Sequence, residues 1–378
     1  MAEPQVYRVG VIGCGRAGTT RARAFDVHPR CEVVAIADTD PENLALGCER
    51  FGVAGYTTWD EMLSSEELDI TMPVLPVEPN ADAVVASAQA GVRAIFCEKP
   101  LTARLSEADR MVEECANRGV PLAAGVMVSS HADYLKAYAL AADGEIGQVR
   151  RINLYEGNGQ GGCHGLNLAR KFAGKAPIQH VIGKAEGDAS SDYEEPYDDA
   201  VTGFGRLGGV MCFANGIECY SSYGEITGCG IEVVGDEGVI RNWNNTALGL
   251  SLWKRGPERP HGLVEVRGAF EPWREEPRRY DAEGWLDPGQ VMRGIVDDIV
   301  RALDTGEPLQ STTGDDLRHA LEMAIALRES HRRGHAEVAL PLEDRSLVMY
   351  PERSRWHYKK QIHGPEWYRE QMSHGKRD

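Results

Sequence analysis

The chain has 378 residues, of which 42% are hydrophobic and 26% charged, and this composition is typical of a soluble globular protein of about two domains. Lysine and arginine total 41 against 58 aspartate and glutamate residues, so the net charge of −17 disfavours binding to nucleic acid or to anionic membranes. We expect a cytoplasmic protein without a membrane span, because no apolar stretch approaches the roughly 20 residues that a membrane helix needs.

The first predicted unit, within residues 7–38, is a strand, a glycine-rich turn, a helix to about Val27 and a second strand that ends on Asp38. The turn reads Gly13-Cys14-Gly15-Arg16-Ala17-Gly18, a G-x-G-x-x-G pattern that follows a strand and opens a helix. In this context the pattern predicts a dinucleotide-binding βαβ unit.

The turn residues are candidate cofactor ligands. Gly13 permits the tight turn, Gly15 lets the backbone approach a pyrophosphate, and Gly18 allows the helix to pack closely on the strand. The backbone amides of Arg16 and Ala17 then face the phosphates at the N-terminus of the helix.

Asp38 is the candidate ribose ligand, because a carboxylate at this strand end can accept both hydroxyls of an adenosine ribose. A 2′-phosphate would meet that carboxylate, so the sequence favours NAD over NADP. Asp38 also suits the start of a turn before Thr39-Asp40-Pro41, and both interpretations can hold together.

Strands and helices keep alternating up to about residue 125. We predict a strand at 69–75, a helix that ends at Gly91, a strand at 94–97 and a helix at 105–118. Such alternation is typical of an α/β Rossmann domain, a doubly wound parallel sheet with helices on both faces, over residues 1–125.

The second half, residues 126–378, has a different pattern. Hairpin turns are expected at Asn215-Gly216 and at 236–238, and helices near 289–304 and 315–333. Strand-like segments occur without helices between them at 148–156, 198–206, 209–214 and 217–222. We predict an α+β domain with a large, mainly antiparallel open sheet, whose exposed face is covered in a homodimer or homotetramer.

Further features of the chain lie outside these patterns. The acidic segment 185–200 is interpreted as a solvated loop, and the aromatic and basic tail from about 341 as an ordered or docking segment. The nine cysteines form no C-x-x-C pair, which favours reduced thiols. No metal site is predicted.

The sequence Glu98-Lys99-Pro100 follows the strand at 94–97, at the edge where open parallel sheets bind ligands. Together with the glycine turn, the segment VVAIADTDPENLA and the segment GCHGLNLARKFAG at 162–174, it resembles the Gfo/Idh/MocA family of glucose-fructose oxidoreductase and inositol 2-dehydrogenase. The resemblance covers about residues 9–340.

The resemblance implies two catalytic residues, Lys99 beside nicotinamide and substrate and His164 for exchange of the hydroxyl proton. It implies further cofactor contacts by Thr39, Leu75, Pro76, Asn80, Glu98 and Lys99, and substrate contacts by Lys99, Gln160, His164 and Asn167. These residue types suit the chemistry, because imidazole titrates near neutrality and an ammonium group stabilises a developing alkoxide. The sequence leaves open which of Lys99 and His164 is the base.

The chain departs from the family pattern where Gln160 and Asn167 replace two carboxylates. An amide orients a neighbour but cannot stabilise an imidazolium by charge.

The leading hypothesis is an NAD-dependent oxidoreductase that acts on a ring hydroxyl or ketone of a sugar, glycoside or cyclitol. The first alternative is an NAD-bound enzyme that cleaves a glycoside without net redox change, by transient oxidation and elimination. The second is a non-catalytic nucleotide-sensing protein.

Overall fold

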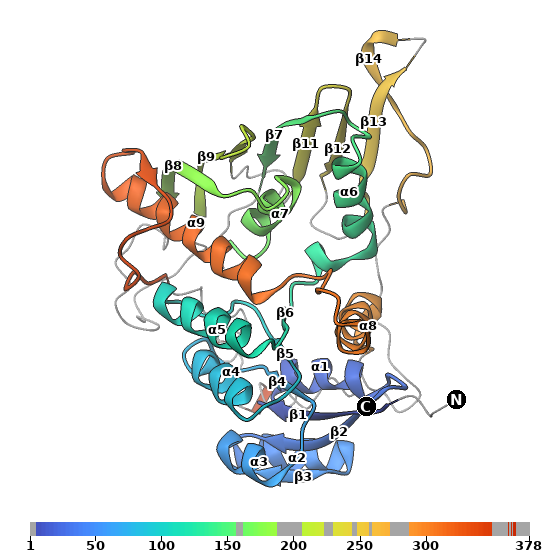
Figure 1. Ribbon diagram of the computed structural model, residues 1–378, viewed down its shortest axis with the longest axis vertical. Coiled ribbons are helices and arrows are strands. Elements are labelled where there is room, and N and C mark those ends of the chain that lie inside the picture. The colour runs from blue at the N-terminus through green and yellow to red at the C-terminus, as the bar shows by residue number, and fades with distance from the viewer. Residues whose placement is uncertain are drawn as a thin grey trace.

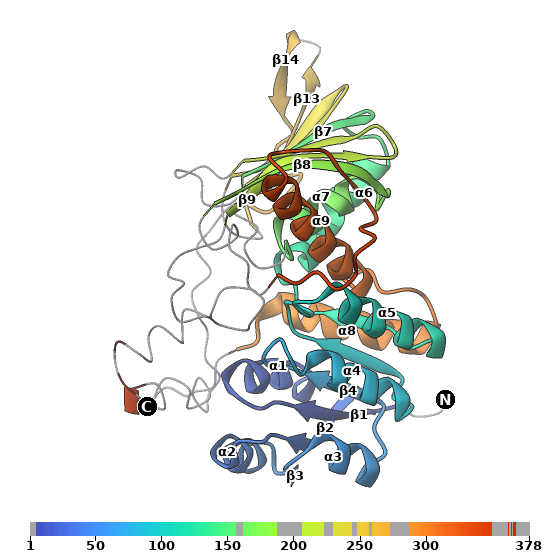
Figure 2. The ribbon, with the colours of Figure 1, turned by 90° about the vertical axis from the view of Figure 1, so that its left-hand side faces the viewer.

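The computed structural model carries one chain with two β-sheets, one near each end of the molecule (Figures 1 and 2). It describes residues 5–155, 162–186, 206–222, 230–243, 248–256, 259–272 and 287–349, and four positions between 362 and 367. No helix among these residues is long and apolar enough to cross a membrane.

The first sheet has six parallel strands in the order β3-β2-β1-β4-β5-β6. Its strands are β1 (Tyr7–Ile12), β2 (Cys31–Ala37), β3 (Ala54–Tyr56), β4 (Ile70–Pro73), β5 (Ala94–Cys97) and β6 (Leu122–Ala124). The helices that connect them are α1 (Arg16–Asp26), α2 (Pro41–Phe51), α3 (Trp59–Ser65), α4 (Asn80–Gln89) and α5 (Leu105–Arg118). The predicted doubly wound parallel sheet is confirmed.

Helices cover both faces of this sheet. On one face Val9 and Val11 of β1 pack in a core with Phe25 of α1. On the other face Ile12 packs with Met62 of α3 and with α4. The helices α2, α3 and the strand β3 were not predicted, although α2 has strong local signals: the Asp40 carboxylate accepts from the amides of the first turn, and Gly52 ends the helix at a φ of 67°.

One helix from late in the chain, α8 (Gly289–Thr305), packs in the core of the first sheet. Its residues Met292, Ile295 and Ile299 are buried against α1. The Tyr7 hydroxyl on β1 donates to the Asp304 carboxylate at 2.5 Å. The core of the first sheet therefore includes a helix from near residue 300, and no local pattern indicates this packing.

The second sheet has nine strands in the order β14-β13-β12-β11-β7-β10-β9-β8-β15. The strands are β7 (Val149–Leu154), β8 (Ile178–Glu186), β9 (Arg206–Phe213), β10 (Glu218–Ser221), β11 (Ile231–Gly235), β12 (Gly238–Asn242), β13 (Ser251–Gly256), β14 (Arg259–Glu265) and β15 (Val338–Ala339). The sheet is open and mainly antiparallel as predicted, and both predicted hairpins form, β9–β10 and β11–β12. The pair β7–β10 is parallel, which the sequence analysis did not anticipate.

Helices lie on one side of this second sheet, as Figure 2 shows. They are α6 (Ala132–Ala142), which follows the 3₁₀ turn η1 (Val128–Ser130), α7 (Gly165–Phe172) and α9 (Gly314–Arg332). The predicted helices near 289–304 and 315–333 match α8 and α9, whereas α6 was missed. Alternate residues of β8, such as Val181 and Ala185, are buried in the core that α9 completes. Most of the acidic segment 185–200, all of the predicted strand 198–206 except its last residue, and most of the tail lie outside the described residues.

Candidate cofactor and proton-transfer site

The glycine turn joins β1 to α1 at the carboxyl edge of the first sheet. Gly13 has a φ of 86°, and a Cβ there would lie 2.5 Å from the Val74 carbonyl oxygen. A Cβ on Gly18 would lie 1.9 Å from the Gly13 carbonyl oxygen. Both positions therefore require glycine, as the sequence pattern implies.

The N-terminus of α1 has the properties of a phosphate site. Its N-cap Gly15 forms no side-chain cap, and its first turn has no acidic residue. A Cβ on Gly15 would find its nearest neighbour, Asn43, 3.8 Å away, so this glycine borders open space. Ala17 is exposed beside it. These features fit a pyrophosphate at the uncapped amides and positive end of the helix dipole.

Asp38 lies directly after β2 and is held by two backbone amides. Cys14 donates to one of its carboxylate oxygens at 2.8 Å, and Asp40 donates to the other at 2.8 Å. The carboxylate thus starts the turn before α2 and also fixes the glycine turn, while it stays partly exposed beside the exposed Thr39. Each carboxylate oxygen has a second lone pair available for a ribose hydroxyl.

Lys99 is partly exposed directly after β5, and its neighbours are held in place. Glu98 is 9% exposed and accepts from Arg21 of α1 at 2.8 Å. The buried Asn80, at the start of α4, donates its side-chain amide to the Leu101 carbonyl at 3.3 Å. Asn80 thus fixes the Lys99 loop by a direct hydrogen bond, which the sequence pattern does not reveal.

His164 is the N-cap residue of α7, and its Nδ1 atom is buried with no hydrogen-bond partner in the described part of the chain. Burial lowers the pKa of His164 to about 4, and the positive charge of Lys99 contributes to the shift. Because the charge of Lys99 acts on His164, these two predicted catalytic residues lie near each other. Lys99 follows β5 of the first sheet, whereas His164 begins α7 beside the second sheet. At neutral pH the imidazole is therefore uncharged and able to accept a proton.

Asn167 follows His164 on α7 and is completely buried. Its amide nitrogen donates to the Ser129 hydroxyl at 3.0 Å and approaches the Thr312 hydroxyl at 3.4 Å. Its Oδ1 atom is buried without a partner in the described ranges. We call Ser129, Asn167 and Thr312 the buried polar cluster; it joins η1, α7 and the segment that precedes α9.

Leu75 and Pro76, two further predicted cofactor contacts, follow β4. Leu75 is partly exposed and Pro76 exposed, and a Cβ on Gly13 would meet the Leu75 side chain at 2.8 Å. These two residues therefore lie beside the glycine turn. Gln160 is outside the described residues.

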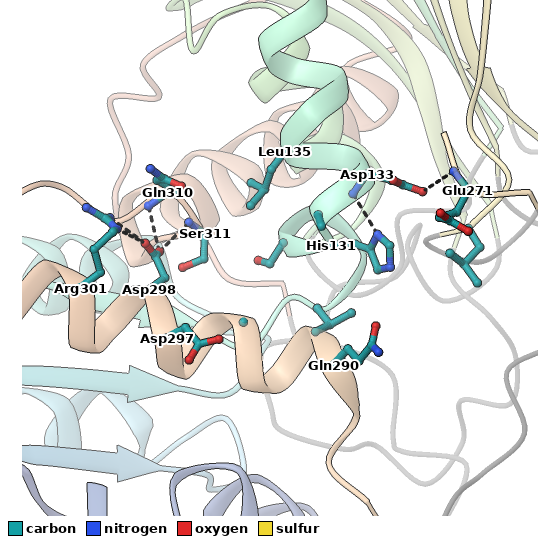
Figure 3. A pocket seen from close by; sticks show the side chains of 15 residues that line it. His131, Asp133, Leu135, Glu271, Gln290, Asp297, Asp298, Arg301, Gln310 and Ser311 are labelled. Atoms are coloured by element: carbon teal, nitrogen blue, oxygen red, sulfur yellow. Dashed lines mark hydrogen bonds and ion pairs between the residues drawn. The ribbon is translucent and has the colours of Figure 1, made fainter. Parts of the chain in front are cut away.

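Thr312 reaches the buried polar cluster because the connection between α8 and α9 is fixed at two points. The carboxylate of Asp298 accepts from the amides of Gln310 and Ser311, at 2.9 and 2.8 Å, and also from Arg301 (Figure 3). The Thr312 carbonyl then accepts from the amide of Ala124, at the end of β6. The same region borders a cavity of about 530 Å³ between α6 and α8, and none of its lining residues is a predicted site residue.

The sequence analysis missed Arg21, Ser129, Asp298 and Thr312, which orient the predicted site residues. None of them lies in a motif, and each acts through a contact distant in sequence. No group of three or more potential metal ligands occurs among the residues that the structure describes.

Residues 7–126 match the family model described as an oxidoreductase family with an NAD-binding Rossmann fold, GFO_IDH_MocA. Among curated proteins, a dTDP-3,4-didehydro-2,6-dideoxy-alpha-D-glucose 3-reductase of Streptomyces violaceoruber is 31% identical over 150 residues, 39% of this chain and 44% of the relative. The myo-inositol 2-dehydrogenase of Thermotoga maritima is 30% identical over 148 residues, with coverage of 39% and 44%. The chain thus matches less than half the length of these two relatives.

Solved structures resemble most of the chain. An oxidoreductase from Agrobacterium radiobacter in complex with NAD+, L-tartaric acid and magnesium superposes with a TM-score of 0.69 and 21% identity over 88% of this chain and 98% of that one. Levoglucosan dehydrogenase in complex with NADH and levoglucosan gives a TM-score of 0.70 and 18% identity, with coverage of 89% and 100%. These likenesses establish that the two-sheet fold is shared. Residues 7–126 therefore match the NAD-binding Rossmann model of the Gfo/Idh/MocA oxidoreductase family, and the chain as a whole has the fold of these solved structures.

Proposed function

We propose that the protein is an NAD-dependent oxidoreductase that acts on a ring hydroxyl or ketone of a sugar, glycoside or cyclitol. The observation that carries this proposal is the proximity of Lys99 to His164, since the charge of Lys99 adds to burial in lowering the pKa of His164. A lysine ammonium near a neutral imidazole whose Nδ1 atom is buried suits removal of a hydroxyl proton. The named activities of the relatives, a sugar reductase and an inositol dehydrogenase, support the same class of substrate.

The cofactor would bind along the carboxyl edge of the first sheet. The amides at the start of α1 would hold its pyrophosphate, and Asp38 its adenosine ribose, for which the carboxylate favours NAD over NADP. Thr39, Leu75 and Pro76 border this path, and Asn80 and Glu98 support the loop that presents Lys99. When bound, NAD supplies the hydride acceptor.

The chain's own residues would manage the proton. His164 accepts the hydroxyl proton, because its imidazole is neutral at physiological pH. Lys99 stabilises the developing negative charge on the substrate oxygen. Gln160 would contact the substrate. Asn167 would act on the substrate through the position of α7, because its amide nitrogen is already hydrogen-bonded to Ser129.

The first experiment is incubation of the protein with NAD and a panel of cyclitols, free sugars and glycosides, with NADH absorbance and product chromatography recorded together. NADH formation with a ketone product supports the proposal. Product without NADH would replace it with the redox-neutral glycoside cleavage, which the neutral amide of Asn167 favours because no carboxylate is present there to stabilise an imidazolium. NAD binding without any product would favour a nucleotide-sensing protein.

We propose in addition that the protein is a cytoplasmic homodimer or homotetramer. Residues 1–125 would form the cofactor domain, to whose core α8 adds, and the rest of 126–378 the substrate and assembly domain. Apolar side chains on the sheet face away from α7 and α9 support the assembly, namely Ile182 and Tyr220, which are 42% and 41% exposed. Such a face needs a cover. Sedimentation at several concentrations tests this, and a monomer throughout would refute it.

A further inference from the structure

After β15 the chain turns back to the first domain and lies against the start of α5. We call residues 342–349 the C-terminal strap. Its Val348 forms an antiparallel bridge with Arg104, and the Met349 amide donates to the Ala103 carbonyl at 2.8 Å. The strap is therefore paired with the segment that links the Lys99 loop to α5.

The strap also caps α5. The first N–H groups of any α-helix have no acceptor within the helix, and the N-cap residue Arg104 provides no side-chain acceptor. Instead, the amide of Leu105 donates to the Leu347 carbonyl at 3.2 Å, and the amide of Ser106 donates to the Arg345 carbonyl at 2.8 Å. Backbone carbonyls of the strap thus replace the usual Ser, Thr or Asp cap.

The side chain of Arg345 ties the strap to two helices. Its Nε and Nη2 atoms donate to the two carboxylate oxygens of Asp109 on α5, both at 2.7 Å. Its Nη1 atom donates to Glu322 of α9, a carboxylate that also accepts from the Leu342 amide at 2.9 Å. The Glu322 side chain is only 5% exposed. One guanidinium therefore connects α5, α9 and the strap through a bidentate pair and a buried carboxylate.

Only residues 100–103 lie between Lys99 and Arg104, the residue that pairs with the strap. Within these residues, the Leu101 carbonyl accepts from the side-chain amide of Asn80 on α4 at 3.3 Å. Lys99 is thus followed by two fixed points, at Leu101 and Arg104, which lie two and five residues further along the chain. We therefore expect a change at either point to alter the position of Lys99.

We propose that the C-terminal strap, fixed by Arg345, positions Lys99 for proton transfer, so that Arg345 is a positioning residue of the site. The proposal rests on the proposed function, because it takes the catalytic role of Lys99 from there. A displacement of about 1 Å at a reacting group can reduce turnover by on the order of 100-fold.

The test compares the double variant Arg345→Met/Glu322→Gln with the wild type. Glu322→Gln removes the charge that would otherwise be left buried without its partner, and it retains an acceptor for the Leu342 amide. The matched control is Arg150→Met, which breaks an exposed bidentate pair with Asp236, at 2.8 and 2.9 Å, on the second sheet. Turnover, KM, the Kd of NADH and hydrogen exchange of peptides that span 99–106 are measured for each.

We expect the double variant to lose roughly tenfold or more in kcat, with the Kd of NADH unchanged and with faster exchange in peptides spanning 99–106. The control should match the wild type in all measurements. If the double variant does not fold, Arg345→Lys serves, because it keeps the charge but loses the fork, and it should lose part of kcat. A variant with unchanged kcat, or with unchanged exchange at 99–106, would overturn the proposal.

The hydrogen-exchange arm separates this proposal from the proposed function. A wild-type protein without turnover on any substrate would defeat the proposed function, and the proposed role of the strap would then fail with it as regards catalysis. Faster exchange at 99–106 in the double variant would still establish that the strap orders the Lys99 loop.

Discussion

The amide nitrogen of Asn167 lies 3.0 Å from the hydroxyl oxygen of Ser129, and both side chains are completely buried. Asn167 belongs to the first turn of α7, whose N-cap is His164. The hydrogen bond therefore fixes the end of the helix that presents the imidazole, and it ties that end to η1 at the junction between the two sheets. Asn167, predicted to contact substrate, is thus placed to position His164 through the backbone of α7.

This relationship predicts the effect of Asn167→Ala. Removal of the amide leaves the hydroxyls of Ser129 and Thr312 with fewer buried partners, so we expect a loss of about 1–3 kcal/mol in the free energy of unfolding and a lower kcat. Denaturant unfolding and steady-state kinetics provide the measurement. The control is Asn153→Ala, whose amide donates to Glu232 on the second sheet at 3.2 Å. An Asn167→Ala protein with the stability and turnover of the wild type would contradict the role of the buried polar cluster.

Replacement of Lys99 by Met is expected to reduce kcat by about 10²–10⁴-fold while NADH still binds. The same change removes the positive charge that helps to lower the pKa of His164, so that pKa should rise from about 4 while burial still holds it below 6.5. Histidine NMR titration and NADH fluorescence titration measure the two effects. Lys175→Met, on an exposed lysine paired with Asp316, is the matched control. Full turnover in the Lys99 variant would exclude the proposed chemistry.

The lowered pKa of His164 also predicts how stability depends on pH. Between about 4 and 6.5 the unfolded chain binds a proton at this histidine and the folded chain does not, so the free energy of unfolding decreases as pH falls through this window. Above 6.5 the contribution is fully present. In His164→Gln this part of the pH dependence should disappear, as measured by thermal unfolding at pH values from 4 to 8. The same slope in wild type and variant would show that His164 is not buried in its neutral form.

Lys171 is a second buried group with a lowered pKa, and its substitution is predicted to stabilise the protein. Lys171 of α7 is 8% exposed, and its Nζ atom lies 5.4 Å from the centre of the Tyr138 ring. Burial lowers the pKa of Lys171 to about 8 despite the opposing charge of Asp316. Below pH 8 the buried lysine is therefore charged, which destabilises the folded protein. Lys171→Met should raise Tm at pH 7, and this increase in Tm should become smaller as the pH rises from 8 to above 10. A lower Tm at pH 7 would mean that the ammonium group is well solvated or paired.

Asp38→Ala is expected to weaken NAD binding about tenfold or more, because the carboxylate fixes the glycine turn through the Cys14 amide and would also bind the ribose. Asp38→Asn keeps one acceptor for that amide and loses the charge, so it should bind NAD weakly yet discriminate less against NADP. Fluorescence titration with NADH and NADPH distinguishes the two variants. Unchanged affinity in both would remove Asp38 from the cofactor site.

The sequence by itself determined the elements whose signals are local. The glycine turn is such a case, since Gly13 and Gly18 occupy positions where any side chain would meet backbone atoms within 2.5 Å. Hairpins at Asn215-Gly216 and at 236–238, and the helices α5 and α9, also follow from turn chemistry and apolar periodicity within short windows. The resemblance in motif order also indicated Lys99 and His164 as candidate site residues. Lys99 closely follows a strand, and His164 begins a helix.

Only the tertiary structure decided which distant segments meet. The packing of α8 against the first sheet, the buried polar cluster of Ser129, Asn167 and Thr312, and the pairing of Arg345 with Asp109 join residues far apart in the chain. Single polar residues carry no periodicity, and their partners depend on how complete elements pack. For the same reason Asn80 and Asn167 gave no sign in the sequence that their amide nitrogens bind the Leu101 carbonyl and the Ser129 hydroxyl.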